Sequence, residues 1–512
     1  MHDASGPHGG HHGFYVSRPA ARTQTPPVSE TVSPVASRRV VAVLAGAGTM
    51  VSLMQTLVIP LLPQLPRLLD TSVANASWVV TAALLTAAVA TPLLGRLGDL
   101  YGRRRLLVTS VLALTVGSLV CALGSSLLAL VIGRTLQGLG ISVIPLGISI
   151  MRDVLPAARL GPAVALMSSS LGIGAALGLP LSATVAEHFG WHAPFWLAAA
   201  LGVTFTVLII TVVPESPVRV RKRFDAPGAV GLSVGLVTLL LPVSKGGDWG
   251  WSSPAILALF AVSLVVLLSW GAWELRVTAP IVDLRSSARR PVLMTNLATV
   301  TVGFAMYSAN LLSPQMLQLP TATGYGQGLS MLHTGLLLAP GGLTMMAFSP
   351  VAARMSAAFG PRSCLLLGTV IIGMADVLAQ LLIGSTWGIV LFTVVNSCGV
   401  GVAYAAMPNL IMRSVPVTET AAANGLNALA RSLGTSTAST VVGLVLGQMT
   451  IRLGSVAVPS ESGIRVCLAI GAAGALFATL VELAIPPRPT PEPAAVTATA
   501  TELEPTATPA TG

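Results

Sequence analysis

The sequence predicts an all-α integral membrane protein with fourteen membrane-spanning helices. Of the 512 residues, 53% are hydrophobic and only 9% are charged, and the mean hydropathy is +0.80; soluble domains carry about 25% charged residues. The apolar residues also gather in runs of about 20, the length that a helix needs to cross a bilayer core of ~30 Å. A large soluble helical core would not contain so many uncharged runs of spanning length.

The fourteen runs follow one another along the chain and are numbered here as spans one to fourteen. In order they cover 39–62, 76–98, 105–125, 127–150, 161–186, 193–213, 228–243, 254–273, 292–316, 331–351, 364–384, 386–410, 421–448 and 463–485.

The arginines and lysines predict the orientation of these spans. With both termini inside, 22 of the 28 fall on the inner side, three lie outside (Arg67, Lys245, Arg452) and three lie within spans (Arg134, Arg431, Arg465). By the positive-inside rule, this bias places both termini in the cytoplasm; the protein is expected in the plasma (inner) membrane. The net charge of +10 is therefore explained by the basic residues on the inner side of the membrane, and it implies no nucleic-acid partner.

The two tails and the four cysteines are expected to have no structured or metal-binding role. Residues 1–38 and 486–512 are rich in Pro, Ser, Thr, Gly or Ala and are expected to be disordered cytoplasmic tails. The first apolar run starts about 38 residues in and has full spanning length, so no cleavable signal peptide is expected. The four cysteines fall in or beside apolar spans without paired spacing (Cys121, Cys364, Cys398, Cys467), which argues against a disulfide framework or a metal site.

An internal repeat divides the remaining chain. TPLLGRLGDLYGRRRLL (91–107) matches SPVAARMSAAFGPRSCL (349–365) at an offset of 258, and GLGISVIPLGISIMR (138–152) matches GVGVAYAAMPNLIMR (399–413) at an offset of 261. The repeat predicts two six-helix halves, 39–213 and 292–485, with 214–291 supplying two inserted helices. Parallel repeats with a pathway between them are typical of transporters.

The stretch GRLGDLYGRRR (95–105) concentrates charge in the predicted inner turn between spans two and three. The glycines permit close approach of backbones, and Asp99 can pair with Arg103 four residues on. We expect Asp99 also to face the positive start of span thirteen, near 418–421, and so to form an inner gate between the halves. The residues assigned to this gate motif are Gly95, Arg96, Asp99, Gly102, Arg103 and Arg104.

This stretch resembles the loop signature of the major facilitator superfamily, and the fourteen spans resemble its drug:proton antiporter branch. RTLQGLG (134–140), GIGAALGLPLSA (172–183), FDAPG (224–228) and DWGW (248–251) are similar to further motifs of that branch. The resemblance implies export of small amphiphilic compounds by alternating access, driven by the proton gradient. It also implies a monomer that works in the lipid bilayer without a bound cofactor and without catalysis. One departure is that Met54 stands where the branch carries a first-helix aspartate; Gln55 and Thr56 remain as polar candidates there.

Charged and polar residues inside the spans are candidates for the transport pathway, because each charge costs roughly 2.5–3.5 kcal/mol at a helix centre. Arg134 and Gln137 belong to the fourth-span motif. Asn424, Asn427 and Arg431 share one helical face by spacing. Together the two arginines predict a positive cavity that favours neutral or anionic amphiphiles over permanent cations.

Other polar and small residues receive different assignments. Asp376 is a candidate proton carrier, although the family pattern puts its helix at the periphery, where a structural role is equally expected. Gly174, Gly178 and Pro180 form a helix-packing motif. Glu187, His188 and Glu482 are expected at the membrane interfaces.

Two other functions remain open from the sequence. A transporter of one endogenous metabolite, uncoupled from protons, would fit the missing first-span aspartate. A membrane-embedded enzyme or a non-transporting receptor would require a catalytic constellation or a sensor domain, and the sequence shows no P-loop, HExxH, CxxC or Ser-His-Asp pattern.

The predicted orientation can be tested with single cysteines at residues 222 and 248 in a cysteine-free chain. An impermeant thiol reagent added to intact cells should label position 248 and leave position 222 unlabelled. Labelling of position 222 from outside would overturn the orientation.

Overall fold

The structure is a computed structural model, and it describes residues 34–58, 61, 65–71, 73–76, 78–215, 223–453 and 456–485. Residues 1–33 of the predicted tail over 1–38 lie outside the described residues, and so does the whole predicted tail over 486–512.

The described residues contain fourteen helices that are long and apolar enough to cross a membrane, which confirms the predicted fold class. They are α1 (Pro34–Thr56), α4 (Trp78–Tyr101), α5 (Arg103–Leu123), α6 (Leu127–Gly138) continued by η2 (Leu139–Ser142) and α7 (Val143–Val154), α8 (Ala157–Phe189), α9 (Ala193–Val212), α10 (Ala226–Trp249), α11 (Pro254–Glu274), α13 (Arg290–Gln318), α14 (Met331–Ala358), α15 (Pro361–Leu382), α16 (Thr386–Ser414), α17 (Thr420–Gln448) and α18 (Glu461–Leu483).

Short elements fill the connections between these helices. They are α2 (Leu65–Leu68), α3 (Val73–Ala76), α12 (Leu284–Ser287), the 3₁₀ turns η3 (Thr321–Thr323) and η4 (Val417–Glu419), and an antiparallel hairpin of β1 (Thr450–Leu453) and β2 (Val456–Pro459).

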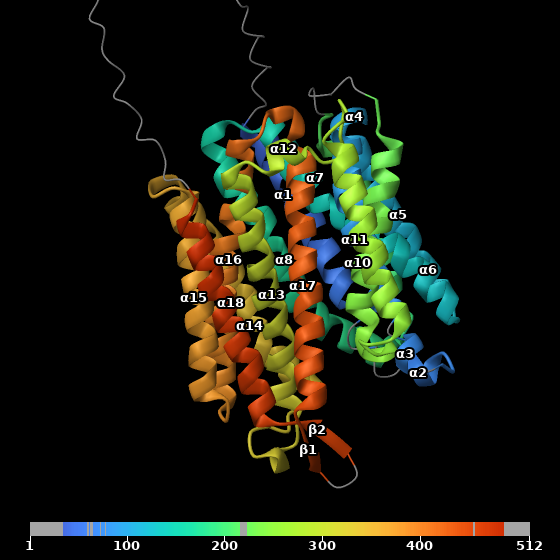
Figure 1. Cartoon of the computed structure of the whole chain (residues 1–512), viewed down its shortest axis with the longest axis vertical. Helices are drawn as coiled ribbons and strands as arrows, with labels where there is room; N and C mark the ends of the chain where they lie inside the picture. Colours follow the sequence, from blue (N-terminus) through green and yellow to red (C-terminus); the bar gives the residue numbers. More distant parts are fainter. Residues whose placement is uncertain are drawn as a thin grey trace, which may run out of the picture.

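The helices stand roughly side by side and share two ends, which we name by their residues (Figure 1). The basic end carries α12, the turn at Gly102 and the start of α17, and the hairpin end carries β1 and β2. Helices of the two halves contact one another: α8 packs against α14, and α4 packs against α17. The inserted helices α10 and α11 pack on each other, and α10 also contacts α4 and α17. The boundaries predicted between the halves and the inserted pair stay predictions.

Local sequence explains where the helices begin and end. Asp225 caps α10, accepting a hydrogen bond from the Gly228 amide at 3.0 Å, as N-cap residues do. Gly102 and Gly360 occupy equivalent positions of the repeat, and both have positive φ, 112° and 85°. Glycine adopts that conformation without steric cost, so each half breaks its chain sharply at the same point.

The fourth span differs from a plain helix because η2 interrupts it. The interruption follows Gly138, where an added Cβ would lie 2.6 Å from the carbonyl oxygen of Ala83. The close approach of α6 to α4 therefore leaves no room for a side chain at this point.

The predicted packing motif in α8 lies against α1. An added Cβ on Gly174 would come within 2.5 Å of Ser52 Cβ and 2.6 Å of the Leu53 amide nitrogen, and Gly178 is in similarly close contact with Thr56. Ser52 donates to the carbonyl oxygen of Leu171 at 2.6 Å. Pro180 lies farther along α8, where an added Cβ on Gly335 of α14 would be 3.6 Å from its ring. Small residues thus let these helices approach closely, as in other membrane bundles.

This packing predicts that Gly174→Ala destabilises the protein by about 1–3 kcal/mol through overpacking. Gly443→Ala in α17 is the matched control, because an added Cβ there meets nothing within 4 Å. Thermal unfolding of the purified variants in detergent checks this expectation. Equal melting temperatures for the two variants would contradict the close α1–α8 contact.

Candidate functional site

The gate motif forms a buried ion-pair cluster at the basic end. Arg103 has no exposed surface, and it bonds to Asp99 Oδ1 through Nε at 3.0 Å and Nη2 at 2.8 Å. Its Nη1 reaches Asp153 Oδ1 at 2.5 Å and the carbonyl oxygen of Ser149 at 3.2 Å. We call Asp99, Arg103 and Asp153 the lock cluster.

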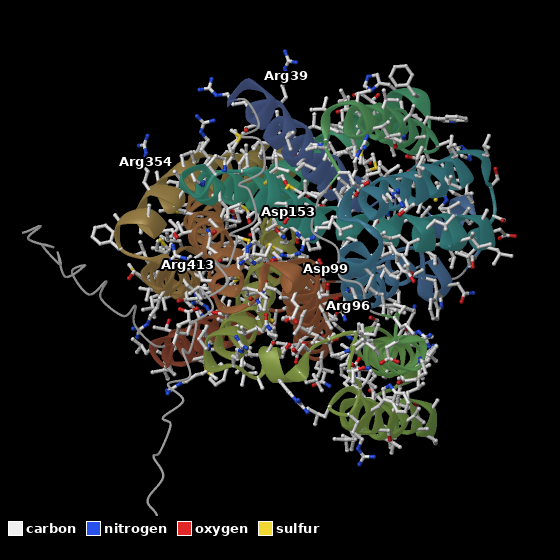
Figure 2. The ribbon with its side chains drawn as sticks, turned by 90° about the horizontal axis from the view of Figure 1, so that it is seen from above. Arg39, Arg96, Asp99, Asp153, Arg354 and Arg413 are labelled. Carbon is white, nitrogen blue, oxygen red and sulfur yellow. The ribbon has the colours of Figure 1, made fainter. Side chains whose placement is uncertain are left out.

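The lock cluster joins the two halves. The Ala422 amide in the first turn of α17 donates to Asp99 Oδ2 at 3.1 Å, and Arg103 Nη2 donates to the carbonyl oxygen of Val417 at 2.8 Å. Arg152 adds a bond to the Thr420 hydroxyl and one to the carbonyl oxygen of Val415. Seen from the basic end, Asp99 and Asp153 lie close together between the halves (Figure 2). The start of α17 therefore faces Asp99, one residue beyond the range expected from the sequence.

The other motif residues have separate surroundings. Arg104 donates to the carbonyl oxygen of Ile210 at the end of α9. Gly95 is buried within α4, and Gly102 supplies the turn. Arg96 is 5% exposed, and its guanidinium is not joined to Asp99 by any hydrogen bond found in the described chain.

A second polar site lies between the halves, where the first half of α7 and the later part of α16 meet the first turns of α17 and the first half of α8. A pocket of about 20 Å³ is lined by α7 and α8 of the first half and by α16 and α17 of the second. Its lining consists of Ile144, Pro145, Ile148, Ser168, Leu171, Tyr404, Met407, Pro408, Asn424, Asn427, Ala428 and Arg431. The structure thus brings Asn424, Asn427 and Arg431 together on the wall of one pocket, the central pocket.

The polar side chains of this central pocket are held differently. Asn427 donates to Asn296 Oδ1 at 3.0 Å and to the Thr299 hydroxyl at 2.6 Å. The Arg431 guanidinium lies over the Tyr404 ring, with its carbon 5.5 Å from the ring centre. A cation over an aromatic face is attracted to it, so Tyr404 holds Arg431 without neutralising its charge.

Arg134 and Gln137 lie inside the first half and outside the lining of the central pocket. Arg134 is 3% exposed and donates to the carbonyl oxygens of Val79 at 3.1 Å and Met54 at 3.3 Å, and to Gln137 Oε1 at 2.7 Å. Gln137 in turn donates to the Ser118 hydroxyl at 2.8 Å. Arg134 therefore ties the end of α1 to α4.

The polar candidates of the first span also face the first half. Thr56 donates to the carbonyl oxygens of Leu53 at 2.9 Å and Gly174 at 3.3 Å, and it lies against α8. Gln55 is partly exposed, and Met54 is 3% exposed. None of the three lines the central pocket.

The membrane carboxylates of the second half lie between α15 and α18. Asp376 is 3% exposed and faces Gly471, where an added Cβ would be 2.6 Å from Asp376 Oδ2; no partner for that oxygen exists among the described residues. Glu482 has no exposed surface, and the Thr369 hydroxyl donates to its Oε2 at 2.8 Å. Glu482 lies one residue before the end of α18 and is buried against Thr369; its predicted place at the membrane interface stays a prediction. Glu187 and His188 are exposed near the end of α8, and their predicted place at the membrane interface stays a prediction.

The sequence reasoning missed two residues that the structure adds to these sites. Asp153 completes the lock cluster, and the only signal for it was its position beside Arg152 at the inner end of span four. Tyr404 stands in the second repeat stretch, GVGVAYAAMPNLIMR, but nothing in that stretch connects it to Arg431. In the described chain, no group of three His, Cys, Asp or Glu side chains could hold a metal ion.

Comparisons with known proteins agree with this architecture. The sequence model of the Major Facilitator Superfamily matches residues 44–439 and 297–509. The tetracenomycin C resistance and export protein of Streptomyces glaucescens is 26% identical, over 80% of this chain and 75% of its own length. The multidrug resistance protein Stp of Mycobacterium tuberculosis is 26% identical, over 79% of this chain and 75% of its own length.

Solved structures share the fold at low sequence identity. The human organic anion transporter MFSD10 superposes with a TM-score of 0.64 and 18% identity, over 87% of this chain and 99% of its own. The proton:xylose symporter XylE gives a TM-score of 0.61 and 13% identity, over 88% of this chain and 96% of its own. The fourteen apolar helices, the repeated halves and these matches establish that the chain is a multi-pass membrane protein belonging to the Major Facilitator Superfamily, whose members are transporters and not enzymes.

Proposed function

We propose that this protein is a secondary active transporter of the plasma membrane that exports small amphiphilic compounds in exchange for protons, with its basic end in the cytoplasm. The observation that carries the proposal is the central pocket, to which both halves contribute apolar walls and polar side chains. Relatives named for multidrug resistance and for tetracenomycin C export support the direction and the class of substrate.

The lock cluster supports alternating access. Asp99, Arg103 and Arg152 hold α17 to the first half, so the halves are joined at the basic end. For a substrate to enter the central pocket from the cytoplasm, these bonds must open. The pocket of about 20 Å³ is also too small for a drug-sized ligand, since such sites usually measure about 300–1,000 Å³. The halves must therefore separate around the pocket during transport.

The charges of the pocket favour particular substrates. Arg431 lines it, and the described residues of the lining include no carboxylate. In a medium with little water, a cation on the wall attracts an anion and repels a cation strongly. Neutral and anionic amphiphiles are therefore the preferred substrates, and the positive charge comes from Arg431 rather than from Arg134, which the backbone of α1 and α4 surrounds.

Proton coupling then requires a carboxylate elsewhere. Asp376 is the candidate, because it is buried within the second half and one of its oxygens has no partner in the described residues. Transport of one endogenous metabolite without protons is the second candidate function, and the observation that favours it is Met54, an apolar residue packed at the first-span position. Proteoliposomes loaded with a panel of fluorescent amphiphiles distinguish the two: coupled export accelerates when a pH gradient is imposed, whereas uncoupled transport does not.

The lock cluster predicts the effect of Asp99→Asn. Removing one charge from a buried ion pair costs about 3–5 kcal/mol, and about 3 kcal/mol changes a two-state population ratio about 100-fold. The variant should therefore open at the basic end and transport slowly while expressing normally. In a chain whose native cysteines are removed, Ser168→Cys places a thiol in the central pocket, and this thiol should react faster with an impermeant reagent in inside-out vesicles.

The control for this variant is Glu461→Gln. Glu461 forms an ion pair of the same i,i+4 spacing with Arg465, at 2.7 Å, but both side chains are more than 40% exposed. Such surface pairs contribute little, so labelling of the thiol introduced at position 168 should stay at the wild-type rate. Unchanged labelling in Asp99→Asn as well would remove the lock cluster from the mechanism.

Substitutions of Arg431 in the central pocket and of Asp376 should impair different steps, substrate binding and proton coupling. Arg431→Gln should weaken binding of an anionic amphiphile about tenfold, the usual loss for one charge-assisted hydrogen bond, and should leave binding of a neutral one nearly unchanged. Asp376→Asn should spare binding and reduce pH-driven export. Equilibrium binding to purified protein and transport in proteoliposomes measure the two effects. Efficient pH-driven export of quaternary ammonium compounds, undiminished in Asp376→Asn, would refute both assignments.

A further inference from the structure

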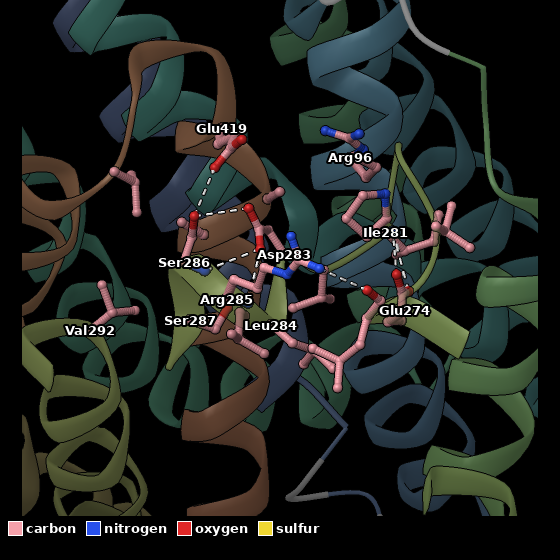
Figure 3. Close-up of a pocket in the computed structure, with 18 of the residues that line it drawn as sticks. Arg96, Glu274, Ile281, Asp283, Leu284, Arg285, Ser286, Ser287, Val292 and Glu419 are labelled. Atoms are coloured by element: carbon pink, nitrogen blue, oxygen red, sulfur yellow. Dashed lines mark hydrogen bonds between the residues drawn. The ribbon is translucent and has the colours of Figure 1, made fainter. Parts of the chain in front are cut away.

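A second and larger cavity lies at the basic end, apart from the central pocket. It measures about 320 Å³, within the range of small-molecule sites. Its walls are the end of α4, the start of α17 and the segment from Glu274 to Ser287 that follows the inserted helices (Figure 3). We call this segment the cover segment.

Arg96 of α4 lines this cavity with a buried guanidinium. The residue is 5% exposed, and its Nε is buried without a hydrogen-bond partner in the described part of the chain. Buried polar groups are nearly always paired, and a buried charge that lacks its partners is costly. The position therefore calls for an acceptor.

The internal repeat shows that the fold itself does not demand this burial. Arg354 is the equivalent of Arg96 in the second half, at an offset of 258, and it is exposed at the basic end. Figure 2 shows Arg354 at the rim of the molecule and Arg96 between the halves, near Asp99. The burial of Arg96 is specific to the cavity beside the lock cluster.

The charged groups that the structure describes next to Arg96 balance one another and leave the positive charge of Arg96 without a partner among them. The lock cluster and Arg152 contribute two positive and two negative charges, and both Asp99 oxygens are occupied by Arg103 and by the Ala422 amide. Asp99 attracts Arg96 electrostatically but has given its hydrogen bonds to others. Arg96 is thus the charge that this cluster does not satisfy.

The carboxylates on the cavity wall are engaged within the cover segment and its contact with η4. Glu274 accepts from the Ile281 amide at 3.1 and 3.2 Å, and Glu419 lies 3.4 Å from the Ser286 hydroxyl. Asp283 accepts from the amides of Arg285 and Ser286. Burial raises the pKa of Asp283, but these hydrogen bonds outweigh it and hold the pKa below its usual value. This carboxylate therefore stays ionised as the cap of α12.

The basic side chains of the cover segment complete the wall. Arg276 and Arg285 also line the cavity, and Arg285 donates to the carbonyl oxygen of Leu275 at 3.1 Å. The described wall therefore carries three basic and three acidic side chains. Arg276 and Arg285 belong to the cover segment, and Arg96 is the basic side chain that α4 contributes.

We propose that this cavity binds an anionic group, a phosphate or a carboxylate, on Arg96 and beside the positive start of α17. The charge-assisted bonds of a guanidinium to such a group are strong and directional, and helix N-termini attract anions. The bound group would bridge α4, α17 and the cover segment, and so stabilise the closed lock cluster. Its source is either a small acid in solution or the headgroup of an anionic lipid.

Binding to the purified protein tests the proposal without any transport assay. Inorganic phosphate is titrated against the protein in neutral detergent, and the melting temperature is followed, because a ligand that binds only the folded state raises it. In a parallel arm without phosphate, nanodiscs of phosphatidylcholine are compared with nanodiscs that also contain phosphatidylglycerol. Arg96→Gln should raise the Kd for phosphate about 10- to 100-fold, whereas Arg354→Gln, which removes the same charge at the equivalent position, should bind as the wild type does.

A second measurement keeps the test valid if Arg96→Gln folds poorly. Ser287→Cys, in a chain with Arg96 intact and the native cysteines removed, places a thiol on the cavity wall, and the bound anion should slow its labelling several-fold. Protection by phosphate in detergent identifies a small acid, and protection only with phosphatidylglycerol identifies a lipid headgroup; both support the site. The proposal is overturned if neither anion protects the thiol at position 287 or raises the melting temperature, or if the anion that binds the wild type binds Arg96→Gln and Arg354→Gln equally.

Discussion

The Arg103 guanidinium is the interaction on which the closed arrangement of the halves depends. Its five N–H donors are all used, on Asp99, Asp153 and the carbonyl oxygens of Ser149 and Val417. Because three of these acceptors belong to the first half and one to the second, a single side chain connects them at the basic end. A buried arginine costs free energy unless all its donors are paired. When the halves separate, the Arg103 donor that binds Val417 must therefore find water or a new partner.

The same constraint explains why two arginines inside the spans have different roles. Arg134 is surrounded by the carbonyl oxygens of Val79 and Met54 and by Gln137, and its Nε and Nη1 bond to these groups and so hold α1 to α4. Arg431 lies over the Tyr404 ring on the wall of the central pocket, where its charge can still act on a substrate. The two arginines differ in role because, in the described part of the chain, acceptors surround Arg134 and not Arg431, and their positions along the spans do not show this difference.

The internal repeat places equivalent residues in unequal surroundings. Gly102 and Gly360 make the same turn in both halves, since only the backbone matters there. Arg96 and Arg354 differ, because the cover segment and α17 bury the first while the second faces outward. The second half also lacks the carboxylate of the lock cluster: position 357, which matches Asp99, is an alanine. The buried ion pairs of the lock cluster therefore form within the first half, where Arg103 meets Asp99 of α4 and Asp153 of α7, beside the start of α17.

The sequence by itself determined the fold class, the fourteen spans, the repeat and the pairing of Asp99 with Arg103, because apolar run length and i,i+4 spacing are local properties. It also placed Asn424, Asn427 and Arg431 on one helical face. Only the tertiary structure decided what that face meets, which is Tyr404 and the α7–α8 wall, and that Asp153 and the α17 amides complete the lock cluster. It alone buried Glu482 against Thr369 and enclosed Arg96 beneath the cover segment. These contacts join residues far apart in sequence, and no spacing along one chain records which helices pack side by side.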